Sequence, residues 1–140
     1  MATVPLMTDA EAERIPAVKA VFDDIRATRN SDFINNIWRA LAFDPDALSR
    51  TWYSLKAVMA SPGALDPKTR EMIYIAVSAA NGCGYCVHSH TAAARAKGMS
   101  EAEHGELLQI IGLAGMTNQL VTTLQVPTDP EFEHPTDPQP

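Results

Sequence analysis

The stretch from Glu71 to His90, EMIYIAVSAANGCGYCVHSH, combines residue types that can carry out thiol chemistry. It contains both cysteines of the chain, Cys83 and Cys86, two of its four histidines, and a carboxylate ahead of an apolar run. A bridge between cysteines this close in sequence closes only a tiny loop and constrains the unfolded chain little. A reactive or metal-binding pair is therefore a better interpretation of the two cysteines than a structural disulfide.

Three of these side chains share one stripe if an α-helix begins at Cys83. At about 100° per residue, Cys86 lies roughly 60° from Cys83 on the helical wheel and His90 lies roughly 20° from it. His88 lies roughly 140° away, on the far side from Cys86. Because side chains four residues apart meet on a helix, His90 rather than His88 is predicted to serve the thiols. Further residues on or beside the stripe are Val87, Ala93, Ala94 and Lys97.

The preceding helix can add a carboxylate to this stripe. Glu71 lies eleven residues before Gly82 and His90 lies eight after it. These separations correspond to roughly 16 Å and 12 Å of helix. If Asn81 and Gly82 fold the two helices into an antiparallel hairpin, Glu71 and His90 come level within a side chain's length. A carboxylate, an imidazole and a thiol then lie in line, which is the arrangement of covalent catalysis.

Proton transfer is the role that we predict for Glu71 and His90. A helix start and a nearby imidazole both lower the pKa of a thiol. A shift from about 8.5 to about 6 raises the thiolate fraction roughly thirty-fold at pH 7, but lowers intrinsic nucleophilicity about ten- to twenty-fold. Because the net gain is small, the useful action is to take a proton from the thiol and supply one to a leaving alkoxide. Peroxide reduction needs such transfers, and a second cysteine can then close a disulfide on the sulfenic acid.

The two cysteines are predicted to act differently. An analogy with thioredoxin favours Cys83, at the exposed helix start, as the nucleophile. The helical wheel favours Cys86, because this residue lies over His90. We predict Cys86 as the nucleophile and Cys83 as the resolving thiol, which an external reductant then attacks.

Each of these residues also has a simpler interpretation. Glu71 could be a first-turn carboxylate favoured by the helix dipole, and His90 a hydrogen-bonded core histidine. The cysteines could be small buried residues or half of a zinc site. Zinc takes four ligands, however, and His88 points away, so no metal site is predicted within one chain.

The surrounding sequence predicts helices that position the stretch. Asp44-Pro45 and Asp66-Pro67 each place a capping side chain before a proline at the first helical position. Gly98 is a typical left-handed helix stop. No stretch alternates over the length of a strand, so the predicted fold class is all-α, with a buried central helix that is apolar on nearly all sides. The predicted helices span about 16–28, 33–41, 45–60, 67–80, 83–97 and 101–125.

Length and charge limit the class of protein. A chain of 140 residues predicts one domain, over 1–126, followed by an extended or disordered proline-rich tail over 127–140. The net charge of −6 argues against nucleic-acid binding. The apolar runs fall short of a membrane span and the start of the chain does not read as a signal peptide, so we expect a cytoplasmic protein without a membrane partner.

The spacing of the site resembles a known family signature. Glu71, eleven residues, Cys83-Gly-Tyr-Cys86, three residues and His90 are similar to the alkylhydroperoxidase D-like branch of the carboxymuconolactone decarboxylase superfamily. The flanking IAVSAANGCGYCVHSHTAAARAKG and the earlier DIRATR…NIWRALAFDP also resemble its peroxidase-related members, so that the resemblance covers roughly 15–127. It implies an all-helical domain with a central antiparallel hairpin that carries the CxxC motif. It also implies a homo-oligomer, often a trimer or a hexamer.

The resemblance implies a peroxiredoxin-type oxidoreductase that reduces alkyl hydroperoxides with its thiols. A dithiol partner of thioredoxin or lipoyl type would reduce it again, with no cofactor beyond the redox-active disulfide. In this family pattern Glu71 and His90 form a proton relay, Cys86 is the peroxidatic thiol and Cys83 resolves. Tyr85 is a departure, because members characterised as the antioxidant adaptor carry a histidine just before the second cysteine.

Two other functions remain open from the sequence. One is a carboxymuconolactone decarboxylase-like enzyme acting on a small lactone or keto acid, although the lactone decarboxylases of the superfamily lack the cysteine pair. The other is a redox-responsive or metal-linked structural oligomer.

Overall fold

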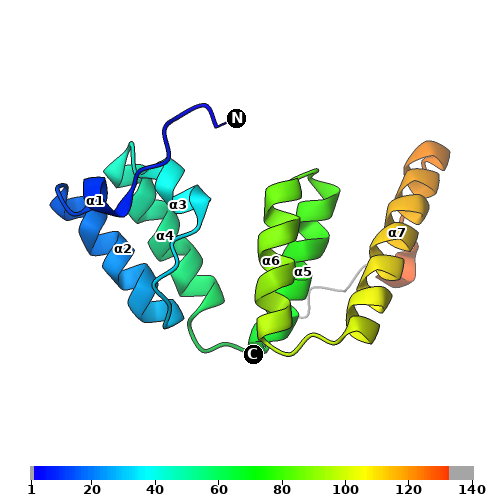
Figure 1. Cartoon of the computed structure of the whole chain (residues 1–140). Coiled ribbons are helices and arrows are strands. Elements are labelled where there is room, and N and C mark those ends of the chain that lie inside the picture. The colour runs from blue at the N-terminus through cyan, green and yellow to red at the C-terminus, as the bar shows by residue number, and fades with distance from the viewer. Residues whose placement is uncertain (1, 133–140) are drawn as a thin grey trace, which may run out of the picture. The chain divides into compact units, whose positions relative to one another are not determined.

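The computed structural model describes residues 2–132, and every regular element in that range is a helix. The predicted all-α class is therefore confirmed. The chain divides into two compact units, one up to Leu65 and one from Asp66 onward, each with its own hydrophobic core (Figure 1). Both units lie mainly within the stretch predicted as one domain, 1–126, and that single domain stays a prediction. Most of the predicted tail, 127–140, lies outside the described residues.

The first unit consists of four helices that begin at recognisable sequence signals. Asp44 accepts hydrogen bonds from the backbone N–H groups of Asp46 and Ala47, which caps the fourth helix as predicted. The third helix begins later than predicted, at Asn36, because its N-cap residue Asn35 is still extended. Just ahead of it, the Arg39 side chain donates to the carbonyl of Ile34 at 3.2 Å. The four are α1 (Asp9–Ala12), α2 (Pro16–Arg29), α3 (Asn36–Leu41) and α4 (Pro45–Met59).

The core of the first unit is built around two tryptophans. Trp38 and Trp52 meet edge to face, with ring centroids 5.3 Å apart, a favourable geometry for aromatic pairs. The apolar positions at helical spacing in α2 and α4 face this pair, as their period predicts. The other fully buried large side chains are Val18, Phe22, Ile25, Ile34 and Leu48.

Asp24 joins α2 to α4 through a small polar cluster. The indole Nε1–H of Trp52 donates to its carboxylate at 2.6 Å, and Lys56 Nζ donates to both oxygens at 2.8 and 2.9 Å. The hydrogen bonds from Lys56 and Trp52 hold the pKa of Asp24 below its ordinary value, against the opposing effect of burial. The carboxylate therefore remains ionised where it orients the Trp52 indole.

We expect Asp24→Ala to lower the free energy of unfolding by about 1–3 kcal/mol, since charged hydrogen bonds of this kind contribute about that much. Urea unfolding followed by tryptophan fluorescence measures the change. Asp23→Ala is the matched control, because Asp23 is an exposed neighbour paired with Lys19, and exposed ion pairs contribute little to stability. Equal losses in the two variants would show that the cluster adds nothing.

The second unit is a helix hairpin followed by one long helix. Asp66 caps the first arm by accepting from the backbone N–H of Thr69, and Ser100 and Glu103 form a capping box at the start of the long helix. The arms turn at Asn81 and Gly82, where Gly82 has a φ of 68°, a conformation that favours glycine. The elements are α5 (Pro67–Ala80), α6 (Gly84–Ala96), α7 (Glu101–Leu124) and the short 3-10 helix η1 (Pro130–Phe132).

The hairpin of α5 and α6 is the central feature of this unit (Figure 1), and it confirms the predicted antiparallel pair that carries the CxxC motif. The prediction that α5 is buried on all sides is wrong. Its inner face buries Glu71, Ile75 and Ser78, but Ile73 and Val77 are about half exposed. The reason is that, among the described residues of its unit, α6 and α7 are the helices that pack on α5, which leaves one apolar face uncovered there.

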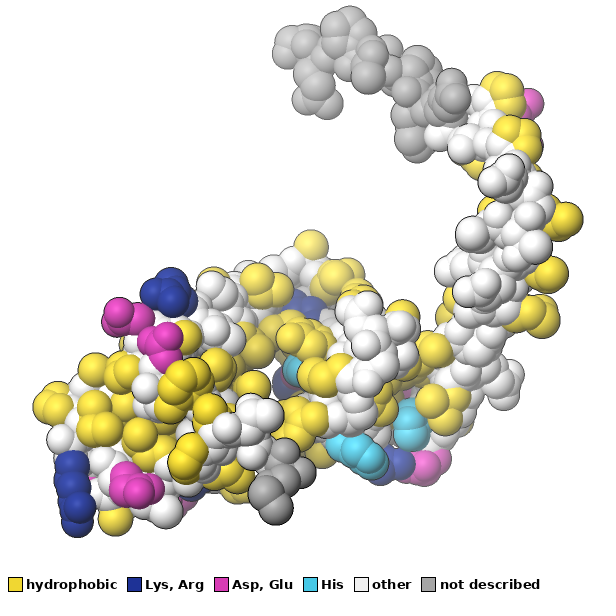
Figure 2. Space-filling view, turned by 90° about the horizontal axis from the view of Figure 1, so that it is seen from above, with side chains coloured by type: hydrophobic (Ala, Val, Ile, Leu, Met, Phe, Trp, Pro, Cys, Tyr) yellow, Lys and Arg dark blue, Asp and Glu magenta, His cyan; other side chains and the backbone are white. Residues whose placement is uncertain are grey.

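The second half of α7 is apolar and exposed. Leu107 is buried and Ile111 packs against the core of the unit, but every residue from Gly112 to Leu124 is exposed. Figure 2 shows the hydrophobic side chains that stand out along this helix. Among the described residues α7 alone has the length and composition of a membrane span, with 6% of its most apolar window buried. Length and composition alone do not distinguish such a span from a helix that packs against protein.

Candidate active site

The turn of the hairpin places both cysteines at the start of α6. Cys83 is the N-cap residue and Cys86 lies in the first turn, and the two form a disulfide. The backbone N–H of Cys86 also donates a hydrogen bond to Sγ of Cys83, with 3.3 Å between nitrogen and sulfur. Both residues are partly buried. The structure therefore holds the oxidised form of the pair at a helix N-terminus, where the helix dipole favours a thiolate after reduction.

Glu71 and His90 meet across the hairpin. The Nδ1 of His90 lies 2.6 Å from Oε2 of Glu71, a contact between residues 19 apart in sequence. The Glu71 side chain is 6% exposed and the His90 side chain 17% exposed. The residue counts on either side of the turn predict this contact. Because Nδ1 faces the carboxylate, Nε2 is the ring nitrogen left to exchange protons.

Lys97 completes the surroundings of the carboxylate. Its Nζ lies 2.6 Å from Oε1 of Glu71, so each oxygen of Glu71 has a nitrogen partner from α6 or its C-terminal end. The sequence places Lys97 beside the stripe of Cys83 and His90 without assigning it a function. Its position two turns after His90 places it on the same side of the helix, but does not name its partner.

Tyr74 is a second neighbour that the sequence does not single out. Its ring stacks on the imidazole of His90, with centroids 3.7 Å apart and planes 18° apart. Tyr74 follows Glu71 by three residues and therefore lies on the same face of α5. The stacked ring restricts the orientation of the imidazole while Glu71 holds its Nδ1.

Burial and hydrogen bonding act on Glu71 in opposite directions. Burial raises the pKa of its carboxyl group, but the hydrogen bonds from His90 and Lys97 and their positive charges lower it by more. The pKa of Glu71 is therefore below its ordinary value, and the group is ionised at neutral pH. An ionised carboxylate orients the imidazole and stabilises the imidazolium that forms when His90 takes up a proton.

Other candidate ligands lie away from this cluster. His88 is exposed on α6, as the helical wheel predicts, and Tyr85 is exposed beside the disulfide. No group of three His, Cys, Asp or Glu side chains in residues 2–132 is arranged to hold a metal ion. That the site works without a metal or cofactor stays a prediction.

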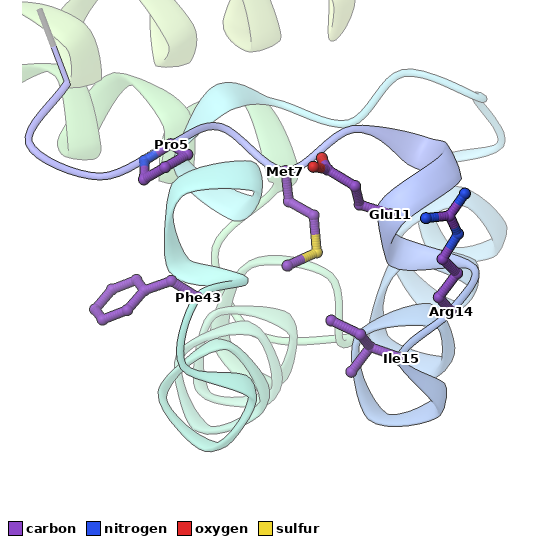
Figure 3. A pocket seen from close by; sticks show the side chains of 6 residues that line it. All are labelled: Pro5, Met7, Glu11, Arg14, Ile15 and Phe43. Carbon is purple, nitrogen blue, oxygen red and sulfur yellow. The ribbon is translucent and has the colours of Figure 1, made fainter.

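The first unit contains an open hollow that brings together none of the predicted site residues. It has a volume of about 380 Å³. Figure 3 shows Met7 and Ile15 pointing into it, and its one carboxylate, Glu11, is engaged in capping α1 through Thr8. The lining residues are Pro5, Met7, Glu11, Arg14, Ile15 and Phe43.

Residues 45–129, which span α4 to α7, match the sequence model of the carboxymuconolactone decarboxylase family. The chain belongs to this family. The match includes the whole hairpin with Glu71, Cys83, Cys86 and His90, and it covers more than half of the chain.

Similar proteins place the chain in the alkylhydroperoxidase D-like branch. An alkyl hydroperoxide reductase AhpD from Solibacter usitatus is 42% identical over 73 residues, or 52% of this chain and 39% of that protein. One from Azorhizobium caulinodans is 34% identical over 99 residues, or 66% of this chain and 53% of that protein. This chain thus spans about half or less of the length of these curated relatives.

A solved structure matches almost the whole chain. The crystal structure of an alkylhydroperoxidase AhpD core from Rhodospirillum rubrum has a TM-score of 0.95 and 66% sequence identity. The match covers 96% of this chain and 99% of that one. Together with the family match, it confirms the family and fold that the Glu71, CxxC and His90 spacing indicates.

Replacing the buried carboxylate tests its ionisation. We expect Glu71→Gln to lower the free energy of unfolding by about 1–3 kcal/mol at pH 7 without unfolding the helices. Because the pKa of Glu71 is lowered by folding, its contribution is complete above the ordinary value of 4.5 and is lost as the pH falls through the lowered pKa. Wild type and variant should therefore converge in urea unfolding at acidic pH.

Glu106→Gln is the control, since Glu106 is an exposed carboxylate on α7. It should change stability little at either pH. A difference between wild type and Glu71→Gln that is the same at pH 7 and pH 3 would contradict an ionised, paired Glu71.

Proposed function

We propose that this protein is a thiol-dependent peroxidase that reduces alkyl hydroperoxides, a peroxiredoxin-type oxidoreductase. One observation carries the proposal, namely that a cysteine pair at a helix start shares a hairpin with a buried carboxylate–imidazole pair. The alkyl hydroperoxide reductases among its relatives support the substrate class. The reduction then proceeds in three balanced steps.

In the first step the Cys86 thiol loses its proton to Nε2 of His90. The thiolate attacks the hydroperoxide, so that an S–O bond forms and the O–O bond breaks. The leaving alkoxide takes the proton from His90 and departs as an alcohol. Cys86 is then a sulfenic acid, and Glu71 has stabilised the transient imidazolium through Nδ1.

In the second step the Cys83 thiol attacks the sulfur of the Cys86 sulfenic acid. The S–S bond forms, the S–O bond breaks, and the hydroxide leaves as water with the proton of the Cys83 thiol. The product is the disulfide present in the structure. Two thiols have been oxidised and one hydroperoxide has been reduced.

In the third step an external dithiol, of thioredoxin or lipoyl type, reduces the disulfide. One of its thiolates attacks Cys83, its second thiol resolves the mixed disulfide, and both cysteines return to thiols. Cys83 and Cys86 are both partly buried, so residue exposure does not select the sulfur that is attacked. The position of Cys83 ahead of the first turn of α6 favours it.

We also propose that the protein is a homo-oligomer, a trimer or a hexamer. The second half of α7 carries a narrow apolar stripe at spacings of three and four residues, which suits packing against another helix. Asn118 and Thr122 lie on the opposite face of α7. A membrane span would be apolar on all sides, so the two-faced helix favours a protein partner. The stripe consists of Leu113, Met116, Leu120 and Leu124, all more than half exposed.

The reaction predicts a loss of two thiols per chain. We expect reduced protein to lose both free thiols to tert-butyl hydroperoxide, as counted by thiol titration. Cys86→Ser should abolish turnover with dithiothreitol as the dithiol. Cys83→Ser should still form one sulfenic acid but accumulate it, because no resolving thiol is present.

Ser89→Ala is the matched control, since Ser89 lies one turn after Cys86 and, among the described residues, its hydroxyl donates only to the Cys86 carbonyl. It should turn over as the wild type does. Full turnover in Cys86→Ser would rule out the proposed peroxidase. The alternatives would then be an enzyme that processes a lactone or keto acid, or a protein that acts as a structural oligomer.

The apolar stripe of α7 predicts the oligomeric state. We expect Leu120→Glu to shift the protein to a smaller species in size-exclusion chromatography with light scattering, because a buried charge opposes association. Thr122→Glu, on the opposite face of α7, is the control and should leave the mass unchanged. A wild type that is monomeric, or that floats with phospholipid vesicles, would contradict the proposal.

A further inference from the structure

The buried carboxylate of Glu71 has two partners, and the peroxidase reaction uses only one of them. Oε2 faces Nδ1 of His90 at 2.6 Å and Oε1 faces Nζ of Lys97, also at 2.6 Å. The Glu71 side chain is 6% exposed, whereas that of Lys97 is 36% exposed. A buried carboxylate is stable as an anion only when it is paired and hydrogen-bonded. Lys97 supplies that pairing with its ammonium group.

We propose that Lys97 is a positioning residue that sets the proton affinity of the Glu71–His90 pair. Lys97 keeps Glu71 ionised and holds its second oxygen, so that the first oxygen remains aimed at Nδ1 of His90. The proposal rests on the proposed peroxidase for its catalytic consequence. The protonation of the pair itself can be measured whether or not the protein is a peroxidase.

The charge of Lys97 has a definite effect on proton transfer. A buried glutamate paired with histidine alone would hold an added proton tightly, because the anion stabilises the imidazolium. A histidine locked in that form cannot accept the proton of the Cys86 thiol. The ammonium group of Lys97 offsets the glutamate charge, which weakens proton binding to the pair. His90 can then both accept the proton of the Cys86 thiol and pass it on.

Other charged groups near this end of the hairpin are engaged elsewhere. Two of them form ion pairs with residues of α7, and Arg70, the neighbour of Glu71 in sequence, is not among the groups that shift the pKa of Glu71. On α5, Lys68 pairs with Glu103 of α7 at 2.6 Å. On α6, Arg95 pairs with Glu101 of α7 at 3.0 Å, and it also lies 3.4 Å from Nδ1 of His104 on α7. Tyr74 faces His90 as a stacked ring. The charged groups that act on the carboxyl group of Glu71 are His90 and Lys97.

The test compares Lys97→Met, Lys97→Arg and the matched control Lys68→Met. Lys68→Met removes the same charge from the same hairpin, one turn before Glu71, without touching the pair. The readout is the pH midpoint at which His90 titrates in the oxidised protein, followed by NMR of its ring protons and assigned with His90→Gln. Oxidised protein keeps this readout independent of peroxidase activity.

We expect Lys97→Met to raise the midpoint by about one pH unit, a tenfold gain in proton affinity of the size that a neighbouring charge produces. Lys97→Arg should restore the wild-type midpoint, and Lys68→Met should leave it unchanged. The pH profile for oxidation of Cys86 by tert-butyl hydroperoxide should shift to higher pH in Lys97→Met alone. A midpoint unchanged in folded Lys97→Met would overturn the proposal.

A measurement on wild-type protein decides the question if Lys97→Met fails to fold. In an NMR titration, the chemical shift of the carboxyl carbon of Glu71 should remain that of a carboxylate down to a pH below 4.5, the ordinary pKa of a glutamate. Titration of Glu71 above that value would overturn the assignment. If the NMR midpoints shift as expected while no variant or wild type consumes hydroperoxide, the peroxidase fails and the role of Lys97 stands.

Discussion

The buried carboxylate of Glu71 is the constraint around which the hairpin is organised. Removed from water, it is stable only if both oxygens find donors, and both donors come from the other arm. This requirement holds α5 and α6 level with one another from the turn at Gly82 to Lys97 at the end of α6. The same contacts orient the imidazole of His90, so the stability of the hairpin and the chemistry of the site depend on one group.

The cysteines lie at the other end of the same hairpin, where the chain turns from α5 into α6. Cys83 caps α6 and Cys86 lies in its first turn, where a thiolate is favoured by the helix dipole. His90 lies one turn further along the helix, with Glu71 behind it and Tyr74 stacked on its ring. A single helix therefore carries the cysteines at its start, the imidazole one turn further on and, at its C-terminal end, the charge of Lys97 that acts on Glu71.

The two units are stabilised in different ways. The first contains a well-packed core around two tryptophans, joined by the carboxylate of Asp24. The second has a smaller core, and leaves an apolar face of α5 and half of α7 exposed. Most of the family match falls on this second unit. The part of the chain that carries the site is thus also the part with the most uncovered apolar surface.

Local signals in the sequence determined the helices, the hairpin and the contact between Glu71 and His90. Signals that start or end a helix act within one turn of that helix. Because the rise per residue is constant, one can calculate which residues of two antiparallel helices lie side by side. The helical wheel likewise predicted that His88 points away from Cys86 and does not belong to the site. Tertiary structure alone decided that Lys97 takes the second oxygen of Glu71, that Tyr74 stacks on His90, and that one face of α5 stays exposed. These features depend on how each helix is rotated about its axis and which helices pack on it, and residue spacing along one chain does not specify either.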